Sequence, residues 1–166
     1  AFDGDVYWGL EADSMSEDAL TYAQDHLRIL SGLYGVLRPM DAIQAYRLEM
    51  GTKMENGRGK SLYEFWGSRI ADRLKADLSG HTDSTVVNLA SNEYFKAVNT
   101  KALGEMVVGA KFLNIKNGAA RSLMYYAKHA RGRMARWIME NEVDQAEGLK
   151  DFNVDGYSLD KNASTD

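Results

Sequence analysis

The sequence predicts an α/β (α+β) fold in which a mixed sheet is flanked by helices. Three observations indicate it. The apolar runs at residues 85–90 and 107–115 have the composition of buried strands. Asn117 and Gly118 are typical of a tight β-hairpin turn, so the chain should return as a third strand over residues 120–126. Apolar residues at helical spacing mark the flanking helices.

The composition is that of one domain that can bury a core, with 166 residues of which 45% are hydrophobic. The absence of cysteine excludes disulfides and thiol chemistry, and it fits a cytoplasmic location. No apolar run approaches the roughly 20 residues that a membrane span requires. The chain opens on Ala1 and a polar turn rather than on Met, so we expect the natural N-terminus to lie upstream.

Charge is distributed unevenly along the chain, although the net charge is only −4. Residues 1–27 carry seven acidic side chains and no Lys or Arg. Residues 28–136 carry eighteen Lys or Arg against nine acidic residues, and the last thirty residues are acidic again. A basic middle between acidic ends can present an anion-binding face. The alternative is ordinary solvated surface.

The first helix should begin at a capping box formed by Ser14 and Glu17 and should run to about Leu30. The segment that follows, residues 30–41, is the one around which the chain is organised. Its two glycines permit a turn with positive φ and leave backbone N–H groups uncovered, so that they can face an anion. Pro39 suits the first position of a new helix.

We therefore expect a helix, a glycine hairpin and a second helix, which is the outline of the helix-hairpin-helix unit that grips a nucleic-acid backbone. The alternative is a plain link between two packed helices. The hairpin residues are Gly32, Leu33, Tyr34 and Gly35.

After the hairpin, a brief helix over residues 42–46 and a half-buried strand over residues 46–50 are expected. Arg47 and Glu49 would share one face of that strand, either as a salt bridge or as a phosphate-binding arginine oriented by a carboxylate. The next loop carries cations that can meet phosphates before a helix N-terminus. These cations are Lys53, Arg58 and Lys60. A phosphate-binding P-loop is rejected, because Met54 stands where that motif needs a glycine.

The strand at residues 85–90 ends in polar residues, and the carboxyl end of a buried strand is a common place for a binding site. The same residues are also ordinary helix caps. Ser91, Glu93 and Lys96 are the candidates here. If the protein were an enzyme acting on a nucleotide, nucleoside or nucleic acid, Glu49 or Glu93 would serve as acid or base. Lys96 and Tyr94 would lie beside them.

The segment after residue 126 predicts a basic amphipathic helix. One side carries His129, Arg133, Arg136 and Glu140, with Lys128 and Arg131 flanking it, and the opposite side is apolar. Such a cluster of cations is costly to leave unpaired, whereas a phosphate chain would neutralise it with release of counterions. The alternative is a solvated helix.

Metal chemistry has little support, because the three histidines are isolated and cysteine is absent. His81 with Asp83 is a weak pair without a third ligand. We therefore predict no metal site and no cofactor.

Six segments resemble the YaaA peroxide stress proteins of bacteria, in order and over nearly the whole chain. They are LRILSGLYGVLRPMD (27–41), YRLEMG (46–51), LYEFWG (62–67), NLASNEYFK (88–96), YAKHARGRM (126–134) and FNVDGY (152–157).

The resemblance implies a cytosolic protein that protects cells from hydrogen peroxide, with lower free iron and less oxidative DNA damage. It implies binding of duplex or distorted DNA through the helix-hairpin-helix and a basic cleft. Our leading hypothesis is a DNA-binding stress protein without an obligatory reaction and without a membrane partner. The cleft would include Arg38, Arg47, Lys96, Lys128 and Arg131. One departure is that two residues, not one, separate the hairpin glycines. The resemblance also implies a single YaaA-like domain over residues 1–166 that lacks its N-terminal third, roughly eighty residues, which typical domain sizes allow.

The DNA hypothesis depends on a spatial arrangement. The glycine hairpin and the arginine-rich helix, a hundred residues apart, must lie side by side to make one cradle for a polyanion.

Overall fold

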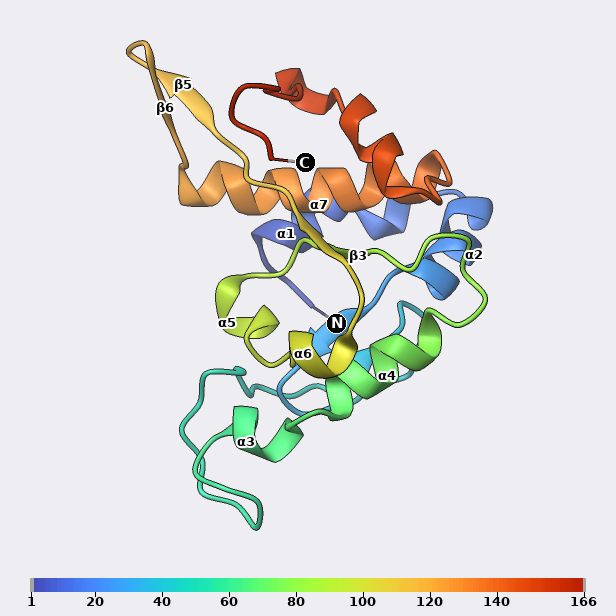
Figure 1. Ribbon diagram of the computed structural model, residues 1–166, viewed down its shortest axis with the longest axis vertical. Coiled ribbons are helices and arrows are strands. Elements are labelled where there is room, and N and C mark those ends of the chain that lie inside the picture. Colours follow the sequence, from blue (N-terminus) through green and yellow to red (C-terminus); the bar gives the residue numbers. More distant parts are fainter. Residues whose placement is uncertain (1, 166) are drawn as a thin grey trace.

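Helices and three small sheets make up the fold in the computed structural model, which describes residues 2–165, so the α/β prediction is confirmed. Figure 1 shows their arrangement. The α-helices are α1 (Asp5–Leu10), α2 (Glu17–His26), α3 (Leu62–Trp66), α4 (Arg69–Asp77), α5 (Asn92–Phe95), α6 (Thr100–Leu103) and α7 (Met124–Glu140). Short 3-10 turns are η1 (Ala12–Ser14), η2 (Ala146–Asp151) and η3 (Val154–Gly156).

The strands form three separate pairs rather than one mixed sheet. Strands β1 (Ile29–Ser31) and β2 (Gly35–Leu37) are antiparallel, β3 (Val86–Asn88) and β4 (Val107–Gly109) are parallel, and β5 (Asn114–Lys116) and β6 (Ala119–Arg121) are antiparallel. The apolar run at residues 107–115 is divided between β4 and β5, because Phe112 between them turns into the core. The predicted turn at Asn117 and Gly118 is confirmed, with both residues at positive φ.

The glycine segment is a β-hairpin, so the expected helix-hairpin-helix is not shown. Helix α2 ends at His26, and β1 and β2 flank the turn. No helix begins at Pro39, because the next helix along the chain is α3. The carboxylate of Asp41 accepts from the backbone N–H of Arg38, which closes a turn instead of starting a helix. The brief helix and the strand expected over residues 42–50 are also wrong, because residues 41–49 have no regular secondary structure.

Serine hydroxyl groups cap helices α2 and α5, but the cap of α2 is two residues later than predicted. The cap of α2 is Ser16, whose Oγ accepts from the N–H of Ala19 at 3.1 Å, whereas Ser14 bonds back to the carbonyl of Glu11. The helix therefore starts at Glu17 and ends four residues earlier than expected. Ser91 caps α5, as the ordinary interpretation of that residue predicted.

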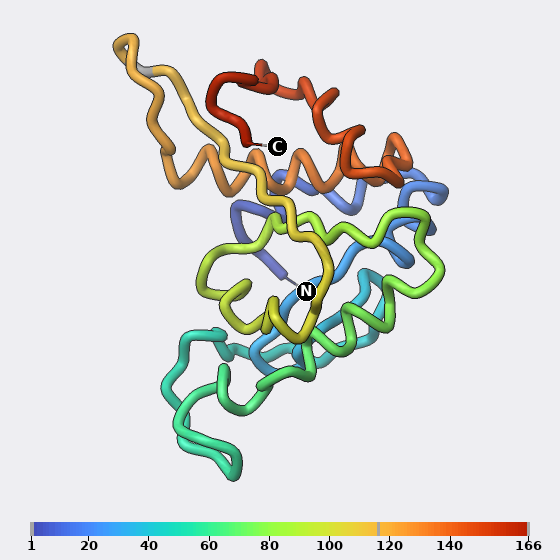
Figure 2. Tube along the Cα trace, viewed as in Figure 1, coloured from blue at the N-terminus to red at the C-terminus, as the bar shows by residue number. Residues whose placement is uncertain are grey.

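Two apolar clusters fill the interior. One gathers around α7 and α2, with Ala23, Ala130, Met134 and Ile138 among its buried members, which confirms the apolar face predicted for α7. The other gathers around α4, with Met50, Leu62, Ile70 and Leu103. Figure 2 shows the C-terminal residues lying over α7, while the loop at residues 51–60 lies at the opposite end of the molecule.

Helices α1 and α7 meet at two glycines, in the position where Figure 1 shows α1 against α7. A Cβ atom on Gly132 would overlap the carbonyl oxygen of Val6, and one on Gly9 would overlap the carbonyl oxygen of His129. The two backbones are therefore in direct contact, and only glycine fits at either position.

Adding one methyl group at this crossing should separate the helices. We expect Gly132→Ala to lower the free energy of unfolding by about 3 kcal/mol, at the upper end for overpacking because backbone rather than a side chain must move. Urea denaturation measures it. Gly57→Ala is the matched control, since a Cβ there meets no atom within 4 Å. Equal stability of the two variants would show that α1 and α7 do not touch in this way.

Candidate nucleic-acid interface

A groove of about 340 Å³ lies beside the glycine hairpin, between β2 and α4. Tyr34 from the hairpin turn and Trp66 from α3 contribute aromatic rings to its wall. We call it the arginine groove, because its charged lining consists of Arg28, Arg38, Arg69, Arg73, Asp41 and Asp77. Four cations against two anions leave the groove positive.

Packing holds the hairpin rigidly on the wall of this groove. The ring of Trp66 lies against Gly35, at φ +76°, where a Cβ would collide with it. The indole N–H of Trp66 donates to the carbonyl of Gly32 at 3.1 Å. The N–H of Tyr34 donates to the buried Ser31 Oγ at 3.0 Å, so this amide is not available to an anion. The turn positions side chains rather than a row of free amides.

Both carboxylates of the groove are already engaged. Asp77 accepts from Arg28 Nε at 2.6 Å and from Arg73 Nε at 2.9 Å. Burial works to raise the pKa of Asp77, but the two arginines more than offset it and the pKa is lowered. Hydrogen bonds from Arg38 likewise lower the pKa of Asp41. At neutral pH each carboxylate is therefore an anion bound to arginine.

The guanidinium groups retain donors for an incoming anion. Arg69 donates to the backbone carbonyls of Phe65 and Trp66, and within residues 2–165 it forms no ion pair. The side chains of Arg38 and Arg73 are 46% and 57% exposed. A guanidinium has five N–H donors in a planar fork that matches phosphate oxygens. The groove therefore presents hydrogen-bond donors of the kind that suit phosphate oxygens.

The cations of α7 are turned inward to the acidic N-terminal segment. Arg133 pairs with Glu11 at 3.1 Å and with Asp155 at 3.2 Å. Arg136 pairs with Glu140 at 2.7 Å and also donates to the Oγ of Ser14 at 2.7 Å. These side chains are only 26% and 15% exposed. The positive charges of Arg133 and Arg136 are therefore neutralised largely by carboxylates of the same chain.

Of the other two cations of α7, Lys128 has a carboxylate partner, whereas Arg131 meets a backbone carbonyl. Lys128 Nζ lies 3.8 Å from a carboxylate oxygen of Asp5, and Arg131 Nη1 lies 3.5 Å from the carbonyl oxygen of Ala90. Neither lines the arginine groove, and residues 32–35 do not line the cavity that these two face. The single cradle predicted for the hairpin and α7 is therefore not formed.

The remaining predicted cations lie away from the groove. Arg47, Lys53 and Lys60 are exposed on segments without regular structure. Two others sit over aromatic rings, Arg58 at 5.1 Å from the centre of the Phe65 ring and Lys96 at 4.9 Å from that of Tyr63. They do not extend the groove, which none of them lines.

The residues proposed for acid–base chemistry do not converge in a pocket. Glu93 Oε1 accepts from the N–H of Gly51 at 2.8 Å, so this carboxylate holds the loop to α5. Glu49, Glu93 and Lys96 are all exposed, and none of them lines either cavity described here. The arrangement offers no concave site for a substrate at these residues.

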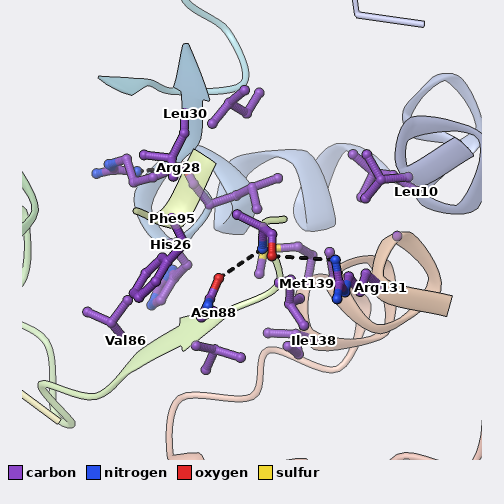
Figure 3. A pocket seen from close by; sticks show the side chains of 18 of the residues that line it. Leu10, His26, Arg28, Leu30, Val86, Asn88, Phe95, Arg131, Ile138 and Met139 are labelled. Atoms are coloured by element: carbon purple, nitrogen blue, oxygen red, sulfur yellow. Dashed lines mark hydrogen bonds between the residues drawn. The ribbon is translucent and has the colours of Figure 1, made fainter. Parts of the chain in front are cut away.

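A larger cavity of about 530 Å³ lies between β1, β3 and α7 (Figure 3). Leu30 comes from β1, and Ile138 and Met139 come from α7. Its polar lining includes the charged residues Arg28, Asp77, Lys128 and Arg131, and also Asn88, whose side-chain oxygen accepts from the N–H of Ala90 at 3.0 Å. Most of the wall is aliphatic or aromatic.

Two of the three histidines, His26 and His81, are in contact, whereas we predicted from the sequence that all three are isolated. The ring of His26 stacks on Tyr22 at 3.7 Å, and His81 meets His26 edge-on at 4.5 Å. Burial lowers the pKa of His81. Over residues 2–165 no group of three or more His, Asp or Glu side chains is arranged to hold a metal ion.

Arg28, Arg69 and Arg73 were missed by sequence reasoning. A usable signal was present, since Arg69 and Arg73 stand four residues apart and therefore share a helix face. Arg28 has no local signal, because its partner Asp77 lies 49 residues away.

Comparison with known proteins decides the family. The model of the family described as "Peroxide stress protein YaaA" matches residues 1–163. The chain belongs to this family. In residues 2–165 no helix is long and apolar enough to cross a membrane. The compartment stays a prediction.

Relatives are similar over 99% of this chain. UPF0246 proteins from Pseudoalteromonas translucida, Alteromonas mediterranea and Caulobacter vibrioides are 56%, 55% and 56% identical over 164, 165 and 165 residues. The chain spans 63%, 64% and 65% of their lengths. Because the family model matches from residue 1, the expected placement as the C-terminal two-thirds is not upheld. The assignment to a single domain stays a prediction.

Removing the shared carboxylate of the groove should destabilise the fold. Asp77→Asn leaves Arg28 and Arg73 without their anionic partner and replaces one accepting oxygen by an NH2 donor, and we expect a loss of about 2 kcal/mol at pH 7 in urea denaturation. Because the pKa of Asp77 is lower in the folded chain, its contribution is complete above about pH 4. It disappears as the pH falls through the folded-state pKa.

The difference between wild type and Asp77→Asn should therefore shrink below pH 4. Asp72→Asn, on an exposed face of α4, is the matched control and should cost at most about 0.5 kcal/mol. A pH-independent difference would mean that the charge of Asp77 is not what stabilises the groove.

Proposed function

We propose that this protein acts in the response to peroxide by binding DNA in the arginine groove. The observation that carries the proposal is a groove with four arginines and only two carboxylates, both of which are already bound to arginine. Its lining includes Arg69, whose guanidinium meets only backbone carbonyls. The membership in a peroxide stress family gives the biological setting.

The chemistry of the groove favours the sugar-phosphate backbone over base edges. Guanidinium groups are spaced along an open channel with the rings of Tyr34 and Trp66 beside them. Such contacts fix a duplex in place but carry no sequence information. Binding should therefore be largely independent of sequence and should weaken steeply with salt.

The glycine hairpin has a different role from the one that a helix-hairpin-helix would give it. Its amide at Tyr34 is used internally, and the turn holds Tyr34 and Arg38 at the edge of the groove. Lower free iron, which the family resemblance implies, would follow indirectly. No cluster of metal-binding side chains lies within residues 2–165.

The salt dependence of DNA binding tests this surface. For Arg69→Gln and for Arg38→Gln, the slope of log K against log salt should fall by about one unit each, because each removes one phosphate contact. Fluorescence anisotropy with a labelled duplex measures it.

Two control variants distinguish a specific effect of the groove arginines from the general effect of removing one positive charge. Lys101→Gln removes an exposed cation outside the groove. Arg133→Gln removes an ion-paired cation of α7. Both should leave the slope unchanged. A slope that falls with Arg133→Gln but not with Arg69→Gln would place the DNA on α7 and contradict the proposal, and affinity that does not vary with salt would contradict it altogether.

A further inference from the structure

The cavity between β1, β3 and α7 is unlike a pocket for a small polar ligand. It measures about 530 Å³ and is bounded by side chains such as Leu10, Leu30, Val87 and Ile138. Transferring apolar surface of this kind from water is favourable. A wall so largely apolar is therefore expected to be covered by other apolar groups.

One open strand edge adjoins this cavity. β3 pairs only with β4 among the described strands, and the N–H of Val86 donates to the carbonyl of Met106 on that side at 2.8 Å. Because backbone groups alternate along a strand, the N–H and carbonyl of Val87 point to the other edge. No backbone partner for Val87 is found within residues 2–165.

The apolar composition of β3 is typical of a fully buried strand, but the structure leaves this strand partly exposed. Val86, Val87 and Asn88 are all only half-buried, and so is Leu89 after them. Parallel strands occur almost only in sheets that are covered on both faces, and a two-stranded sheet alone is marginally stable. The β3–β4 pair thus has the character of part of a larger sheet.

The relatives contain additional chain. Matched regions cover 63–65% of their lengths, so each relative has a little over a third of its residues outside the match. An added strand of about five residues is enough to run the length of β3.

We propose that this cavity is the docking site of an additional β-strand, which pairs with the free edge of β3. The occupant is an extended apolar segment from the third of the family's length that this chain does not match. Its side chains cover Leu30, Val87 and Ile138, and its backbone accepts and donates at Val87. This inference does not rest on the DNA proposal, although Arg28 and Asp77 line both the cavity and the arginine groove.

Amide exchange at Val87 tests the inference directly. The two samples are this chain alone and a hybrid in which the unmatched part of the Pseudoalteromonas translucida relative is joined to this chain in the order it has in the relative. The amide of Val87 should exchange at least about a hundredfold more slowly in the hybrid, as expected for a paired strand residue. Ile115, 83% exposed on β5, is an internal control and should not change.

A pair of proline variants gives a second readout. Val87→Pro removes the amide at the free edge, so it should destabilise the hybrid more than this chain alone. Val86→Pro removes an amide already bonded to Met106, so it should destabilise both equally. Equal exchange at Val87 in both samples would overturn the inference. It would also be overturned if this chain alone were a dimer with Val87 already protected, since a second copy would then fill the cavity.

Discussion

The direct backbone contact between α1 and α7 is the constraint on which the rest of the structure depends. Gly9 and Gly132 allow each helix to reach the carbonyl groups of the other. Arg136 then crosses to the carbonyl of Glu11 at 3.0 Å and to Ser14, and Arg133 reaches the carboxylate of Glu11. The short N-terminal helix is thereby fixed to the longest helix of the fold. With α7 held in this way, its apolar face becomes one wall of the cavity opposite β3.

This contact also affects where unpaired positive charge remains in the fold. Asp5 and Glu11 of the N-terminal segment pair with Lys128, Arg133 and Arg136, so three of the four cations of α7 have a carboxylate partner. The arginines beside the hairpin have only two carboxylates between them, and they share those two. Cations therefore outnumber carboxylates in the arginine groove, on the side of the fold where α4 lies. A local excess of this kind, more than net charge, directs a polyanion to one face.

Local patterns predicted much of the fold. Strand β3, the cap at Ser91, the turn at Asn117 and Gly118, and the buried stripe of α7 each depend on neighbouring residues, and each is confirmed. The helix-hairpin-helix failed because Trp66, over thirty residues away, binds the turn as a β-hairpin. Arg133 was assigned to phosphate because its partner Glu11 is 122 residues distant along the chain. Spacing along the sequence carries no information about such distant pairs. The spacing of Arg69 and Arg73, four residues apart, did indicate a shared helix face, although the sequence analysis did not use it.

We propose that DNA lies on the arginine groove and not on α7. Hydrogen–deuterium exchange of the protein with and without a duplex, at low salt, tests it most directly. The account predicts slower exchange at residues 34–41 and 66–73 when DNA is present, with residues 124–140 unchanged. Slower exchange confined to residues 124–140, with no change beside the hairpin, would contradict it.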